Sequence, residues 1–133
     1  DLARAELRKA AVAGGPEALI ALRSAIKAGP EKDVRAWMGG LMKSAATAPL
    51  AVRGIGMLGD RSILPWLIER MKEPHVAVAA CAAVLELFPE AREETKLFTA
   101  DPTELGPAFA KHFEDDVVRV ALPDRVAEWM AGR

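Results

Sequence analysis

"GMLGDRSILPWLIERMKEP", residues 56–74, reads as the end of one helix, a short turn and the beginning of a second helix. Gly59 can adopt the left-handed conformation that closes a helix at its C-terminus. Asp60 or Ser62 can cap the helix that follows. If the new helix begins near Ser62, Pro65 falls in its first turn, where its missing N–H group costs little; otherwise Pro65 kinks the helix, which a curved stack can use. The stretch therefore predicts two consecutive helices joined by a tight link.

The same punctuation recurs along the first two thirds of the chain. Glycine and proline separate segments whose apolar side chains follow helical spacing; after the link, for example, Ile63, Leu67 and Met71 recur every four residues. Alanine dominates the apolar residues and aromatic residues make up only 5 %, which favours helix over sheet. We therefore expect an all-α fold, with helices at about 2–13, 16–28, 32–44, 49–58, 62–72 and 76–88.

These predicted helices repeat in pairs. A shift of 30 residues places Leu7 on Trp37, and a shift of 29 places Val34 on Ile63 and Trp37 on Trp66. A single pair of this size cannot bury its apolar stripe, whereas stacked pairs share a continuous apolar seam. The expected architecture is an α-solenoid, a superhelix of three helical hairpins at about 1–29, 30–59 and 60–88, which together span 1–88.

The region 89–133 carries no further copy of the repeat. Phe109 and Phe113 mark one short helix, and Pro123 can open a last helix that carries Trp129 on one face. Irregular tails of this kind commonly cover the apolar end of a solenoid. We therefore expect an irregular C-terminal cap, in which Trp129 is either the anchor of the cap or an exposed anchor for a partner.

A motif within residues 50–88 joins a Leu-Gly-Asp link to a Leu-Pro-x-Leu-Ile helix start, and its residues are Gly56, Leu58, Gly59, Asp60, Leu64, Pro65, Leu67 and Ile68. This pattern resembles the HEAT repeat. The resemblance is looser over 1–49, and it departs at "PHVAVAA", where HEAT repeats usually carry an arginine.

The HEAT resemblance implies a solenoid scaffold that holds protein partners. More narrowly, "LAVRGIGMLGDRSILPWLIERM" together with the later "LPDRVAEWM" is similar to a bacterial HEAT-like family loosely associated with type VI secretion gene clusters. A minority of HEAT arrays bind DNA, and a related repeat class acts on bilin chromophores. Nucleic-acid binding and a bilin-lyase-like activity are therefore the alternatives to a scaffold.

Residues for catalysis or metal binding are scarce. His75, His112 and Cys81 are the only histidines and cysteine, and they show no HxxxH, CxxC or HExxH spacing. We place His75 at the surface and Cys81 in the core as a reduced thiol. The glycines of "GIGMLG" do not follow a predicted strand, as those of a phosphate-binding loop would. We therefore expect no cofactor, no metal and no enzymatic activity.

Charge and hydropathy constrain the partners. The formal net charge of −1 over 133 residues provides no long-range attraction to nucleic acid or to an anionic membrane. No apolar run reaches the length of a membrane span, about 18 residues or more. The chain begins at Asp1 in what reads as the middle of a helix, as a segment of a longer chain would. We expect a cytoplasmic chain whose partner is another protein, with nucleic acid disfavoured and no membrane.

The predicted partner-binding surface follows from the repeat. The second helix of each hairpin usually lines the concave side of a solenoid. The outward row of these helices is expected to contain Arg23, Lys27, Arg53, Met57, Ala83 and Glu86.

This row runs from basic to apolar to acidic, which suits a protein segment better than a polyanion, whose phosphates require an unbroken basic track. Arg53 has an alternative role in a structural ladder with Asp60. The sequence therefore predicts a non-enzymatic interaction scaffold or adaptor, in bacterial secretion or toxin immunity. Its partner-binding residues would be Arg23, Lys27, Arg53, Met57, Glu86 and Trp129.

Overall fold

The computed structural model describes residues 2–133, so that Asp1, at the start of the first predicted hairpin, lies outside the described residues. This part of the chain is mostly helical, which confirms the all-α prediction. Its α-helices are α1 (Leu2–Ala13), α2 (Ala18–Ala28), α3 (Glu31–Leu41), α4 (Ala48–Met57), α5 (Leu64–Arg70), α6 (Pro74–Leu87), α7 (Pro107–Phe113) and α8 (Pro123–Ala131). No helix within 2–133 combines the length and the apolar character that crossing a bilayer requires.

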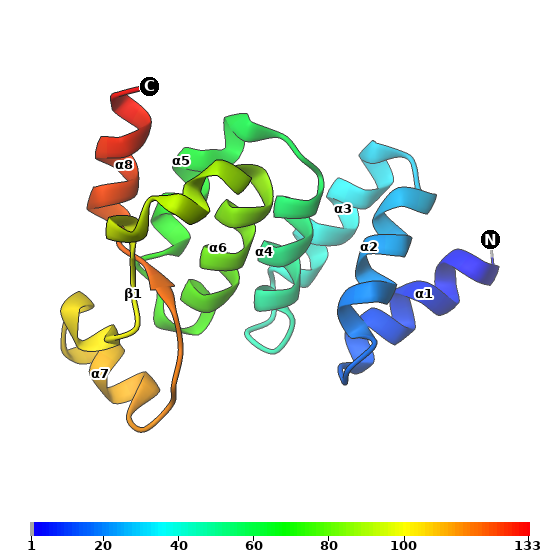
Figure 1. Cartoon of the computed structure of the whole chain (residues 1–133). Helices are drawn as coiled ribbons and strands as arrows, with labels where there is room; N and C mark the ends of the chain where they lie inside the picture. Colours follow the sequence, from blue (N-terminus) through cyan, green and yellow to red (C-terminus); the bar gives the residue numbers. More distant parts are fainter. Residues whose placement is uncertain (1) are drawn as a thin grey trace.

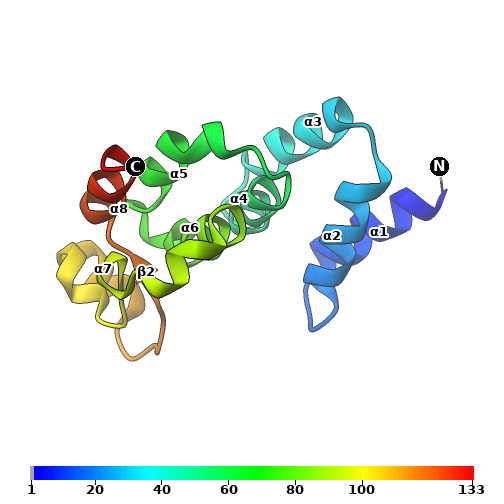
Figure 2. The same ribbon diagram turned by 45° about the horizontal axis from the view of Figure 1, so that its top comes forward.

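The helices follow one another as neighbouring pairs along the molecule, from the N-terminal end at α1 to the C-terminal end at α8 (Figures 1 and 2). Each of the first six packs against its partner in sequence: α1 against α2, α3 against α4, and α5 against α6. Adjacent pairs meet mainly through their second helices, because α2 packs on α4 and α4 packs extensively on α6. The second helices therefore form one continuous layer.

The link between α4 and α5 has the predicted geometry. Gly59 adopts a positive φ of 79°, a conformation that favours glycine. Asp60 is the capping residue, since its carboxylate accepts hydrogen bonds from the backbone N–H of Ser62 at 3.0 Å and from the Ser62 hydroxyl at 2.6 Å. A 3₁₀ turn (Arg61–Ile63) precedes α5, and Pro65 lies in the first turn of that helix. The predicted helix over 62–72 therefore begins with a tighter turn.

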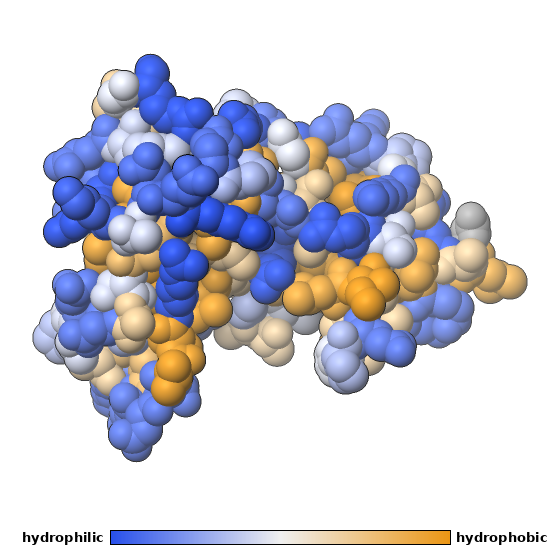
Figure 3. Space-filling view, viewed as in Figure 1, coloured by the Kyte–Doolittle hydropathy of each residue, from blue (hydrophilic) through white to orange (hydrophobic). Residues whose placement is uncertain are grey.

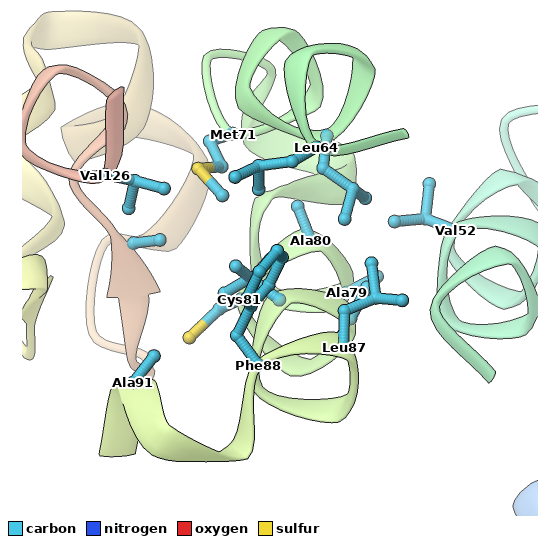
Figure 4. Close-up of a cluster of buried hydrophobic side chains, with 14 of the residues drawn as sticks. Val52, Leu64, Met71, Ala79, Ala80, Cys81, Leu87, Phe88, Ala91 and Val126 are labelled. Atoms are coloured by element: carbon cyan, nitrogen blue, oxygen red, sulfur yellow. The ribbon is translucent and has the colours of Figure 1, made fainter. Parts of the chain in front are cut away.

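The largest apolar cluster joins α4, α5, α6 and the C-terminal region. Its interior contains Met71, which directly follows α5, Cys81 of α6, Phe88, which directly follows α6, and Val126 of α8 (Figure 4). A second cluster fills the space among α1, α2, α3 and α4. The tail thus contributes buried side chains of its own to the main core.

The tail also contains a short sheet. Strands β1 (Phe98–Thr99) and β2 (Val120–Ala121) pair antiparallel, with Phe98 opposite Ala121. Strand β2 packs on α6, and α8 packs on α5.

The predicted outward position of Ala83 is wrong. Ala83 is buried, and it lies where α6 crosses Gly56 of α4. A Cβ atom on Gly56 would come within 2.8 Å of the Ala83 Cα atom, so the two helix backbones are in close contact there. Helix α6 is apolar on nearly all sides and packs on α4, α5 and the tail, which leaves little of its surface for a partner.

Candidate functional site

Four of the predicted partner-binding residues surround one groove. This groove, which we call the α2–α4 groove, has a volume of about 240 Å³. Side chains of α2 and α4 line it: Leu19, Ile20, Arg23, Ser24 and Lys27 from α2, and Arg53 and Met57 from α4. Spacings of three and four residues place these side chains on one face of each helix. The repeat offset in the sequence therefore identified residues that the fold brings together.

Glu86, the fifth predicted residue, lies next to this groove. Its carboxylate accepts a hydrogen bond from the guanidinium of Arg23, which joins α6 to α2. Both side chains are partly exposed, and an exposed ion pair of this kind contributes little to stability. The pair instead holds Arg23 at the border of the groove and balances its charge.

The other two cations of the groove are Lys27 and Arg53. Within residues 2–133, no carboxylate lies at ion-pair distance from Lys27 or Arg53. Arg53 is half-buried, whereas Lys27 is exposed. The groove therefore offers two positive charges to an incoming group.

The alternative ladder between Arg53 and Asp60 is not formed. Asp60 instead pairs with Arg35 of α3 at 3.2 Å, and Arg35 also donates to Glu31 at 3.0 Å. Hydrogen bonds from Ser62, together with the weaker influence of Arg35, lower the pKa of the Asp60 carboxyl. The structural role considered for Arg53 thus belongs to Arg35, and Arg53 remains at the groove.

Two apolar groove residues were absent from the sequence prediction. Ile20 is 70 % exposed and Leu19 is 40 % exposed, and the molecular surface over α2 has a prominent apolar patch (Figure 3). The buried face of α2 is formed by Ala18, Ala21, Leu22, Ala25 and Ile26. Because Leu19 and Ile20 are large apolar residues outside that stripe, the helical pattern alone could have identified them.

Trp129 does not lie at the α2–α4 groove. Helix α8 is at the opposite end of the molecule from α2 (Figure 1). The Trp129 ring is half-buried against the main core, with its centroid 5.8 Å from that of Phe88 in an edge-to-face arrangement. The Arg133 guanidinium covers the ring at 4.4 Å. These contacts favour the anchoring role over the partner-binding role for Trp129.

The two histidines lie at the surface, and the cysteine lies in the core. His75 is exposed, as predicted, and His112 is exposed with its ring against Phe113. No group of three or more histidine, cysteine, aspartate or glutamate side chains within 2–133 is positioned to hold a metal ion. Cys81 is buried in the main core, as predicted.

Burial raises the pKa of the Cys81 thiol to about 11, although the positive charge of Arg119 opposes the shift. We expect this thiol to react with a disulfide reagent at pH 8 much more slowly in the folded chain than in urea, because the thiolate is the reactive species. In the unfolded chain the Cys81 thiol ionises near its ordinary pKa of 9.0. The free energy of unfolding should therefore fall as the pH rises from about 9 towards 11. Equal reaction rates with and without urea would contradict the buried position of Cys81.

No family model, curated protein or solved structure matches the chain.

Proposed function

We propose that the chain is a protein-interaction module, a HEAT-like solenoid of three hairpins whose α2–α4 groove binds a segment of another protein. The observation that carries the proposal is that one groove brings together exposed apolar side chains and two cations, Lys27 and Arg53, which have no carboxylate at ion-pair distance within residues 2–133. The continuous layer of second helices supports the solenoid architecture, since such a layer forms the inner side of stacked hairpins.

The composition of the groove suits a protein ligand. Binding energy in protein interfaces is concentrated in a few central anchors that exclude water from their surroundings. Ile20 and Met57 provide apolar contact area, and the aliphatic part of Lys27 can extend it. The motif resemblance described above makes proteins of bacterial secretion and toxin immunity the first partners to test.

The two alternatives have less support. A nucleic acid needs a track of cations along its phosphates, but Arg23 is already paired with Glu86, and the lining of the groove offers only Lys27 and Arg53 besides it. A bilin-lyase-like reaction needs an accessible nucleophile, and the buried Cys81 thiol does not provide one.

The test is affinity capture from cells that naturally express the protein, with the parent chain and single-site variants as baits. We expect Ile20→Asp and Met57→Asp to lose a captured partner, because each puts a charge where an apolar contact is needed. Val117→Asp is the matched control, since Val117 is 98 % exposed and lies in the tail. Circular dichroism melting should show that all three variants remain folded.

Retention of the partner by both groove variants would contradict the proposal. If only the Trp129→Ala or the Val117→Asp variant failed to capture the partner, the binding surface would lie on the tail instead.

A further inference from the structure

The surface beyond Arg53 continues into a second cavity. This cavity, which we call the α4–α6 pocket, has a volume of about 370 Å³. Residues of α1, α2 and their connecting turn, of the α4 region and of α6 line it. They are Ala11, Val12, Gly14, Ala18, Ala46, Thr47, Pro49, Leu50, Arg53, His75, Val78 and Ala79. Arg53 also lines the α2–α4 groove. The two depressions therefore adjoin at the Arg53 side chain.

The charges of this combined surface have one sign. The lining of the α2–α4 groove contains the cations Arg23, Lys27 and Arg53, and the lining of the α4–α6 pocket shares Arg53. Neither lining contains a carboxylate, and the nearby Glu86 is occupied by Arg23. A ligand that carries a carboxylate would therefore be complementary in charge.

Arg53 is the best placed of these cations to receive that carboxylate. It is half-buried, and it has no acidic partner at ion-pair distance within 2–133. Apolar residues border it on both sides, with Met57 in the groove and Leu50 in the pocket. A charge-assisted hydrogen bond is stronger in such an environment than on an open polar surface, because water screens it less.

The rim of the α4–α6 pocket is also apolar and exposed. Val12 of α1 is 47 % exposed and Val78 of α6 is 41 % exposed, although the two residues come from helices far apart in the sequence. Together with Ile20 in the groove, they place apolar surface on both sides of Arg53. A ligand that covers this surface needs apolar side chains on both sides of its carboxylate.

We propose that the occupant is an acidic amphipathic segment of a partner protein, which lies across Arg53. Its carboxylate pairs with the Arg53 guanidinium, and its apolar side chains enter the α2–α4 groove on one side and the α4–α6 pocket on the other. This inference rests on the proposed function and adds the chemistry of the partner and the extent of the contact.

The test uses two fluorescein-labelled pools of short peptides on the immobilised chain. In one pool every position is drawn from leucine, alanine and glutamate; in the other, lysine replaces glutamate. We expect the chain to retain the glutamate pool at least about tenfold more strongly than the lysine pool, which corresponds to about 1.4 kcal/mol of binding free energy. Equal retention of the two pools, stronger retention of the lysine pool, or retention of neither would overturn the inference.

Two variants locate the contact. Arg53→Gln removes the charge at nearly unchanged polarity, and we expect it to abolish most of the preference for glutamate. Val78→Asp should weaken retention of the glutamate pool by about tenfold, because it places a like charge at the rim of the pocket. Val117→Asp is again the control, and thermal melting should show that each variant is folded.

The outcomes separate this inference from the proposed function. If Ile20→Asp and Met57→Asp lose the captured partner while Val78→Asp and Arg53→Gln bind normally, the groove is the binding site and the extension across Arg53 is wrong. If the groove variants also bind normally, the proposed function itself is wrong.

Discussion

Replacement of Leu67 by alanine is expected to lower the free energy of unfolding by about 2–5 kcal/mol. The Leu67 side chain is 0 % exposed and belongs to the main core. Its loss would remove apolar contacts and leave a cavity that the packed helices can fill only in part. Since small domains are stable by only about 5–15 kcal/mol, the variant would lose a large fraction of its stability. Urea denaturation followed by circular dichroism measures the change.

Leu2→Ala is the matched control for this prediction. Leu2 is 86 % exposed, so the same deletion should change the stability by no more than about 0.5 kcal/mol. A similar loss in both variants, or a negligible loss in Leu67→Ala, would show that α5 does not pack as described.

Gly56→Val is expected to destabilise the chain by about 1–3 kcal/mol, near the upper end of that range. The added Cβ would lie 2.8 Å from both the Cα and the Cβ of Ala83. The opposing atoms belong to a backbone and a short side chain, so no rotamer change can relieve the overlap, and α4 and α6 must move apart. This movement would also disturb the position of Arg53, which lies on α4 at the border of both cavities.

Gly39→Val provides the comparison, because it is the same substitution within a helix. No atom lies within 4 Å of a Cβ built on Gly39, beyond its own chain neighbours and helix backbone. Valine has a higher helix propensity than glycine, so this variant should be as stable as the parent or slightly more stable, within about 0.5 kcal/mol. Thermal melting of the two variants side by side measures the difference, and equal melting temperatures would contradict the close approach of α4 and α6.

The positions of the helices could be predicted because local residues determine them. Gly59, Asp60 and Pro65 define the link before α5, and each acts through its own backbone conformation or a contact two residues away. The pairing of Phe98 with Ala121 could not be predicted in the same way. It joins strands distant in the sequence, and no local pattern specifies their register.

The candidate site was predictable in part. The repeat offset placed Arg23, Arg53 and Met57 in one row, and in the structure these three residues line one groove. It failed for Ala83, because equivalent positions in a repeat have different neighbours: α6 is covered by the tail and crossed closely by α4. The pairing of Arg35 with Asp60 also escaped the prediction. A contact between side chains of different helices depends on rotamers and crossing angles that no local pattern specifies.

Site-directed photo-cross-linking tests the central claim, that the α2–α4 groove binds another protein, most directly. A benzophenone amino acid would replace Ile20 in the groove and, in a second variant, Val117 in the tail, both in cells that naturally express the protein. The proposal predicts that position 20 forms a cross-link to one discrete partner and that position 117 forms none. A partner cross-linked only from position 117, or no cross-link from position 20, would contradict it.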